Sequence, residues 1–361
     1  MTSPTNKVFV NIQAMRAIAA LMVVFGHSLV PKEFPLIEGA LNIFHSFAYA
    51  GVDVFFVLSG FIISMAATRE NGGPFFLRAR HAMVFLLKRF VRIFPVYWII
   101  LGISVFASHW HVLAPAGFAH ESWPVIFLLT QANWLVQQAW TLSFELYFYG
   151  VVSLVLLIAP QRYYRCMALL MAIQAAIVFS VTDPDSQMWT NALILEFGMG
   201  CCVAFFLQKQ IRISATLLLL CGLAFFLRGA VLTSDMIASQ HIQLHSLERM
   251  MTFGVASMLI LYAALKFETG KQFIAGPRMQ FLGDASYAIY LLHMTLLVVI
   301  GALFKNAMLA GVLPKYAEVL ITVALSIACC IVFYSWVERP MLAWLKARIK
   351  LLQMAAGFAV T

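Results

Sequence analysis

The sequence predicts an all-α integral membrane protein, a bundle of about ten transmembrane helices with both termini in the cytoplasm. Of its 361 residues, 63% are hydrophobic and only 11% are charged, whereas a soluble domain is typically about 45–50% apolar and about 25% charged. A soluble protein of this size could not bury so much apolar surface, because its exterior must stay polar. The second observation is that the apolar runs have the length of a membrane helix, about 20 residues.

Polar breaks divide the chain into ten apolar runs. Helices are the only plausible element, because open strands cannot satisfy their backbone in lipid and the runs are far longer than barrel strands. The stretch from Trp123 to Trp134 is too short to cross unaided, so we expect it to be re-entrant or interfacial. We expect the spans near residues 9–30, 51–67, 93–109, 143–160, 166–182, 189–208, 213–232, 248–266, 281–304 and 316–337.

The basic residues set the orientation, because lysine and arginine concentrate in cytoplasmic loops. With the Trp123–Trp134 stretch left out of the spans, most of the 24 lysines and arginines fall on the side of both termini, and few, Arg249 among them, fall outside. This concentration of basic residues beside the apolar runs explains the net charge of +9, so the charge does not require a nucleic-acid-binding function. We expect one polytopic domain over residues 1–361, with its core motifs in residues 16–293 and no separate soluble domain.

The first span carries two ionisable residues, which are costly in lipid and often mark function. Arg16 and His27 are 11 positions apart, so on a helix they project from one face, about 16 Å apart along the axis. Arg16 is expected toward the cytoplasm and His27 toward the outer surface. The structural alternative is that Arg16 reaches the lipid headgroups and His27 is a hydrogen-bonded interfacial histidine.

Two carboxylates are expected at nearly the depth of His27. Asp53 lies near the start of the second span and Glu145 near the start of the fourth. A carboxylate can orient an imidazole and raise its basicity. The three residues are therefore candidates for a catalytic site near the outer face, with Glu145 preferred over Asp53 for orienting His27. A structural polar network that caps the bundle is the alternative.

Other polar residues within the spans leave two interpretations open. Ser64, which follows Ser59 and Gly60, indicates either close helix packing or the lining of a ligand channel. His293, near mid-membrane by count, is either a buried structural histidine or a substrate contact, and Glu196 has no assigned role. The six cysteines lie in apolar runs without metal-ligand spacing, so we expect no metal.

The inner loop expected over residues 68–92 is rich in basic residues. Within it, Arg89 and Arg92 are three positions apart and therefore neighbours on a helix. Paired guanidinium groups suit phosphate oxygens, which favours a platform for a phosphorylated cytoplasmic ligand. The alternatives are a topological anchor and a surface that holds anionic lipid.

Five motifs, in order, resemble the signatures of the acyltransferase-3 family of polytopic membrane O-acyltransferases. Glu338-Arg339-Pro340 is similar to the family's usual ending, and the phrase over residues 12–21 resembles its exopolysaccharide acetyltransferase branch. The motifs are Arg16-x10-His27, Phe56-x2-Ser59-Gly60-Phe61-x2-Ser64, Phe85-x3-Arg89-x2-Arg92-x2-Pro95 with Tyr97-Trp98, Trp140-x-Leu142-Ser143-x-Glu145, and Ser286-Tyr287-x2-Tyr290-Leu291-x-His293.

The resemblance implies a multi-pass enzyme of the bacterial cytoplasmic (inner) membrane that moves an acyl group, usually acetyl, from cytoplasmic acyl-CoA to a hydroxyl of a glycan or lipid-linked glycan. Its expected partners are acetyl-CoA, the glycan acceptor and membrane lipids, with no nucleic acid and no metal. The family pattern assigns catalysis to His27 and the acyl donor to Arg16, Arg89 and Arg92. We expect Ser64 to contribute to binding of the acyl donor as well.

Two questions stay open from the sequence. His27 is expected to act either as a general base or through a transient acyl-imidazole. A secondary transporter or glycan exporter would also suit ten helices with buried charges. Transporters often show paired interrupted helices in repeated halves, a pattern that this sequence does not show.

Overall fold

The computed structural model describes residues 9–28, 38–68, 73–109, 122–129, 133, 135–181, 185, 187–238, 245–306 and 314–355. All regular elements within these ranges are helices, and nine of them are long and apolar enough to cross a membrane. The sixth predicted span corresponds to a shorter apolar helix, α7 (Ile194–Gln208). The prediction of an all-α polytopic membrane protein is confirmed, while the orientation of the termini stays a prediction.

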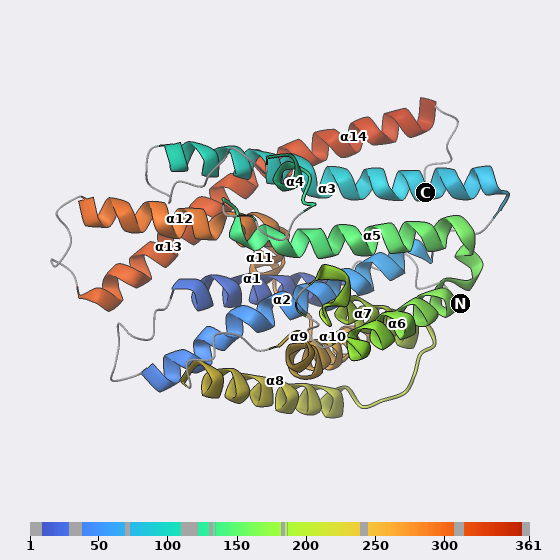
Figure 1. Ribbon diagram of the computed structural model, residues 1–361, viewed down its shortest axis with the longest axis horizontal. Helices are drawn as coiled ribbons and strands as arrows, with labels where there is room; N and C mark the ends of the chain where they lie inside the picture. The colour runs from blue at the N-terminus through green and yellow to red at the C-terminus, as the bar shows by residue number, and fades with distance from the viewer. Residues whose placement is uncertain are drawn as a thin grey trace. The chain divides into compact units, whose positions relative to one another are not determined.

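The chain divides into two compact units, and Figure 1 labels the helices along it. The second unit holds most of α3 (Phe75–His109) and of α5 (Trp140–Ile158), with α4 (Ser122–Ile126), α12 (Ser286–Asn306), α13 (Lys315–Phe333), the π-helix Tyr334–Glu338 and α14 (Arg339–Ala355). The first unit holds α1 (Val10–Ser28), α2 (Glu38–Ala67), α6 (Tyr163–Ser180), α7, α8 (Ala215–Ala238), α9 (Ser246–Arg249), the π-helix Met250–Gly254, α10 (Val255–Thr269) and α11 (Pro277–Asp284).

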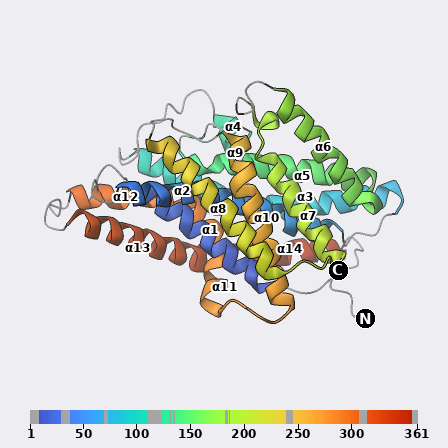
Figure 2. The same ribbon diagram turned by 90° about the horizontal axis from the view of Figure 1, so that it is seen from below.

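Close helix crossings build the first unit, in which α8 and α10 also lie side by side (Figure 2). Helix α2 crosses α7 at two glycines. An added Cβ on Gly60 would lie 2.0 Å from the Phe197 carbonyl oxygen, and one on Gly200 would lie 2.1 Å from the Val57 carbonyl oxygen. Such distances leave no space for a side chain, so backbone packs directly on backbone, as is common between small residues of membrane helices.

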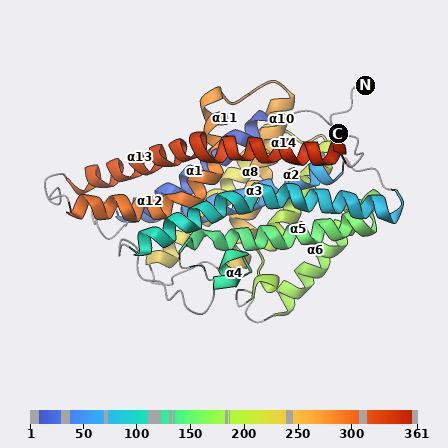
Figure 3. The same cartoon turned by 90° about the horizontal axis from the view of Figure 1, so that it is seen from above.

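Helix α3 and the continuous helix formed by α13 and α14 are longer than the apolar runs that predict them. Helix α3 begins at Phe75, so the expectation of a loop over residues 68–92 is wrong for residues 75–92. Figure 3 shows α13 continuing into α14, well past the expected end near residue 337. The added turns are rich in lysine and arginine, which form helices readily and extend their charged ends to water. Hydropathy alone therefore underestimates the length of these helices.

The segment around Trp123 does not supply a span in the part of the chain that the structure describes. Its helix, α4, has only five residues and is tied to α3. The Tyr97 hydroxyl donates to the Val125 carbonyl oxygen at 2.5 Å, and Trp98 Nε1 donates to the Ile126 carbonyl oxygen at 3.0 Å. Asn133 in turn donates to the Tyr97 hydroxyl at 2.9 Å. The expectation of a non-crossing segment agrees with this arrangement.

Candidate active site

His27 lies in the last turn of α1, and its side chain is exposed. Its Nδ1 atom lies 2.8 Å from the carbonyl oxygen of Val23, one turn earlier. A carbonyl oxygen can only accept a hydrogen bond, so this contact places the proton of the neutral imidazole on Nδ1 and the lone pair on Nε2. The backbone of α1 therefore orients the ring and leaves Nε2 as the basic nitrogen.

Arg16 lies on the same unbroken helix and is half-buried. Its guanidinium donates to Gln13 Oε1 at 3.2 Å, one turn earlier. The regular rise of α1 puts Arg16 about 16 Å from His27 along the axis. The two side chains are too far apart to touch the same reacting carbonyl group.

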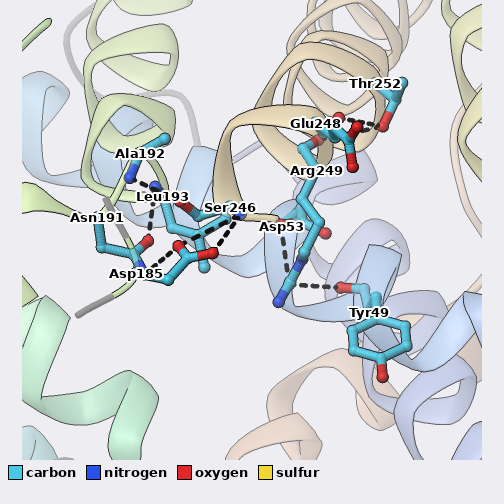
Figure 4. A network of polar contacts seen from close by, with 10 residues as sticks. All are labelled: Tyr49, Asp53, Asp185, Asn191, Ala192, Leu193, Ser246, Glu248, Arg249 and Thr252. Atoms are coloured by element: carbon cyan, nitrogen blue, oxygen red, sulfur yellow. Dashed lines mark hydrogen bonds and ion pairs between the residues drawn. The ribbon is translucent and has the colours of Figure 1, made fainter. Parts of the chain in front are cut away.

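Asp53 is fully buried in α2, where it forms an ion pair with Arg249 (Figure 4). Arg249 Nη2 donates to Asp53 Oδ1 at 3.0 Å and to the Tyr49 carbonyl oxygen at 3.4 Å, and its guanidinium lies 5.1 Å from the centre of the Tyr49 ring. Arg249, which the sequence places among the few basic residues on the outer side, is thus largely buried in an ion pair. Its charge is buried because α9 carries it against a carboxylate of α2.

Glu196, to which the sequence assigns no role, is a third buried ionisable group near this ion pair. Its side chain is 0% exposed, and its carboxyl group lies within interaction range of Asp53 and Arg249. A Cβ added to Gly254 would lie 2.8 Å from Glu196 Oε1, so the π-helix Met250–Gly254 presents a glycine where this carboxyl group needs space. We call Asp53, Glu196 and Arg249 the buried triad.

The start of α9 is held by a second network, also visible in Figure 4. The Asp185 carboxylate accepts a hydrogen bond from the backbone N–H of Ser246, at 3.1 Å to Oδ2. The Ser246 hydroxyl accepts one from the N–H of Ala192 at 3.1 Å, just before α7. An anion at a helix N-terminus is favourable, so this network fixes the two helices that bring Arg249 and Glu196 to Asp53.

Arg89 and Arg92 belong to the second unit, where aromatic rings surround them. The Arg89 guanidinium lies 5.6 Å from the ring centre of Tyr149, and the Arg92 guanidinium lies 5.5 Å from that of Tyr287. Arg92 also lies 3.8 Å from the fully buried carboxylate of Glu338. We call the set the arginine cluster, and it consists of Arg89, Arg92, Glu145, Tyr149, Tyr287 and Glu338.

Glu145 belongs to this cluster because the Tyr149 hydroxyl donates a hydrogen bond to its carboxylate. Two guanidinium groups and two carboxylates give the cluster no net formal charge, which limits the cost of burying them. Since Glu145 and His27 lie in different units, the expected contact between them stays a prediction.

The sequence interpretation missed four residues of the buried triad and the arginine cluster. Tyr287 and Glu338 stand in the motifs that carry the family resemblance, and that is the signal that could have found them. Tyr149 follows Glu145 by one helical turn, a spacing that brings two side chains together. Arg249 gives no such signal, because its partner Asp53 is nearly 200 residues away.

Ser64 lies in the packing interface that α2 forms with α6 and α7. Its Oγ lies 3.0 Å from the Tyr163 hydroxyl and 3.0 Å from Cys201 Sγ, and the residue is fully buried. These contacts favour the packing interpretation over the lining of a ligand channel.

His293 is fully buried in α12. Its Nδ1 lies 2.8 Å from the carbonyl oxygen of Tyr290, whose hydroxyl lies 3.0 Å from that of Thr141. This favours the interpretation of His293 as a structural histidine.

Comparisons with known proteins agree with the resemblance. The chain matches the acyltransferase-3 family, described as an acyltransferase domain, over residues 9–335. It is 29% identical over 335 residues to the exopolysaccharide production protein ExoZ of Rhizobium meliloti (strain 1021), and the alignment covers 86% of this chain and 93% of that protein. No solved structure matches the chain.

Proposed function

Because the chain belongs to the acyltransferase-3 family and is a membrane acyltransferase, we propose that it moves an acyl group, in the first place acetyl, from cytoplasmic acyl-CoA to a hydroxyl of a cell-surface or lipid-linked glycan. The similarity to an exopolysaccharide production protein supports an exopolysaccharide repeat unit as acceptor. The proposed location is the bacterial inner membrane, with both termini in the cytoplasm. The family match favours an enzyme over the transporter alternative.

The arginine cluster is the proposed anchor of the donor. Acyl-CoA carries a phosphorylated nucleotide, and guanidinium groups bind phosphate oxygens through paired charge-assisted hydrogen bonds. Arg89 is half-buried and the Arg92 side chain is 29% exposed, so both keep surface that a ligand can contact. Arg16 is the proposed contact for the pantetheine arm. Ser64, whose hydroxyl already has partners, is the weakest of the donor assignments.

The proposed chemistry centres on Nε2 of His27. In direct transfer, Nε2 takes the proton of the acceptor hydroxyl while the hydroxyl oxygen attacks the thioester carbonyl carbon. The C–S bond then breaks, and the CoA thiolate leaves and receives the proton from the imidazolium. Such general base catalysis contributes about 10²- to 10⁴-fold. An acyl-imidazole intermediate on Nε2 would lead to the same products.

One observation carries this proposal: the side chain of His27, the last residue of the first family motif, is exposed and its ring is held by the Val23 carbonyl oxygen in the tautomer of a base at Nε2. The test is a comparison of surface-glycan O-acetylation, by NMR and mass spectrometry, between cells with and without the gene. We expect acetyl signals on sugar carbons to disappear without the gene and to return on complementation. Identical spectra from both strains would refute the proposed acceptor class.

A further inference from the structure

A second histidine, His45, lies on α2, the helix that packs against the His27 end of α1 in the first unit. Helices α1 and α2 run antiparallel and touch where a Cβ added to Gly26 would lie 2.3 Å from the Cβ of Ala48. His27 follows Gly26 directly, and His45 precedes Ala48 by three residues, which is about one turn toward the start of α2. The two imidazole groups consequently lie within electrostatic range of each other.

The surroundings of His45 favour one tautomer of its ring. The side chain is half-buried, and its Nδ1 atom is buried without a hydrogen-bond partner among the described residues. An unpaired N–H group is costly to bury, more so than an unpaired acceptor. The proton of the neutral imidazole is therefore better placed on Nε2, the tautomer opposite to that of His27.

His45 is held in place by a chain of contacts that leads to the buried triad. Its ring packs edge to face on Tyr49, with ring centres 6.3 Å apart. The Tyr49 ring lies under the Arg249 guanidinium, and Arg249 is fixed by Asp53. The Asp53–Arg249 ion pair thus helps to position Tyr49, against which the His45 ring packs.

We propose that His45 is the acceptor-binding partner of His27: its Nε2–H donates a hydrogen bond to the same acceptor hydroxyl whose proton His27 Nε2 removes. One hydroxyl can accept one hydrogen bond and donate another at the same time, so two imidazoles of opposite tautomer suit it. The bond to His45 orients the oxygen lone pair for attack on the thioester carbonyl carbon. This inference rests on the proposed function of His27.

The test uses membranes of a strain that lacks the gene, which supply the native acceptor, with the full-length protein expressed in them and radiolabelled acetyl-CoA as donor. His45→Phe keeps a ring against Tyr49 but removes the donor. His45→Gln places an amide N–H near the position of Nε2. We expect His45→Phe to lower label transfer to glycan at least tenfold with an unchanged KM for acetyl-CoA, and His45→Gln to recover most of the transfer.

Two results would overturn the inference. The first is full transfer by His45→Phe, and the second is a parallel loss of transfer, donor affinity and protein abundance in both variants, which would indicate a structural residue. Failure of the proposed function has a different signature, because the wild-type protein itself would then transfer no label to glycan.

Discussion

Arg249 donates a hydrogen bond of 3.0 Å to Asp53, and neither residue is more than 7% exposed. Glu196 lies within electrostatic range of both, so the interior of the first unit holds two carboxyl groups and one guanidinium. A buried carboxylate without a counter-charge is very costly. We therefore expect the triad to hold one extra proton and to carry no net charge.

Replacing Arg249 by Met keeps an unbranched stem beside Tyr49 but leaves the buried Asp53 without its cation. Breaking a buried pair in this way typically costs about 3–5 kcal/mol. We expect a much lower midpoint of thermal unfolding for the purified protein in detergent, with Arg249→Lys losing less. A midpoint for Arg249→Met within 2 °C of the wild-type value would contradict a stabilising role for the ion pair.

Substitutions of Glu196 and Asp53 are expected to have non-additive effects on the free energy of unfolding. Glu196→Gln keeps the shape of the side chain and leaves the ion pair of Asp53 with Arg249 in place, so we expect a change below about 1 kcal/mol in the free energy of unfolding. In Asp53→Asn, Glu196 can ionise and pair with Arg249, which limits the loss.

The double variant leaves Arg249 without any carboxylate. It should therefore lose more stability than the sum of the two single variants, by about 0.5–3 kcal/mol. Denaturant unfolding of the four proteins measures this difference, and simple additivity would show that the two carboxyl groups do not share the arginine.

Helix periodicity and hydropathy predict much of the fold, because each depends on residues close together in the chain. They place Arg16 and His27 on one helix and exclude the short Trp123 segment from the spans. They misplace the start of α3, since lysine and arginine lower the mean hydropathy of a segment without ending its helix.

Such local patterns cannot predict the contacts between helices. The charge rule assigns Arg249 only to a side of the membrane, whereas α9, α2 and α7 bring it together with Asp53 and Glu196, which are remote in sequence. The ring of His27 is oriented by a main-chain carbonyl at Val23, a partner that every helix offers and that no motif marks. Site residue types are therefore easier to predict than their partners.

His27→Ala tests the catalytic assignment. Removing the base at Nε2 should lower acyl transfer at least about 100-fold, while protein abundance and the midpoint of thermal unfolding stay at wild-type values because the side chain is exposed. Labelled transfer in membranes and immunoblotting measure the two quantities. Transfer within a factor of ten of wild type would remove His27 from the mechanism.

The arginine cluster allows donor binding to be separated from stability. Arg92→Ala removes the guanidinium partner of Glu338 and should cost about 1–3 kcal/mol, less than a fully buried pair because Arg92 is partly exposed. Adding Glu338→Gln should restore stability but not donor affinity. Both variants should raise the KM for acetyl-CoA, whereas Lys88→Ala, an exposed residue of the same helix, should not.

One outcome would contradict donor binding by Arg92. If the KM for acetyl-CoA returns to the wild-type value together with stability in the double variant, Arg92 acts only as a structural partner of Glu338. If Arg89→Ala also leaves the KM for acetyl-CoA at the wild-type value, neither arginine binds the donor and the pair acts only as topological anchors.

Substitutions at the crossing of α2 and α7 can show whether Ser64 is a packing residue or a donor-binding residue. The first of them measures how tightly the two helices pack. Gly60→Ala puts a methyl group 2.0 Å from the Phe197 carbonyl oxygen, so the helices must separate and we expect a loss of at least about 2 kcal/mol. Gly150→Ala is the matched control, because an added Cβ there meets nothing within 4 Å and alanine favours the helix by about 0.5–1 kcal/mol.

Ser64→Ala should then lower stability by about 1 kcal/mol through the lost hydrogen bonds to Tyr163 and Cys201, with an unchanged KM for acetyl-CoA. A packing residue and a donor-binding residue differ in this one constant, whatever happens to the total activity. A severalfold rise in the KM for acetyl-CoA at wild-type stability would instead place Ser64 against the donor.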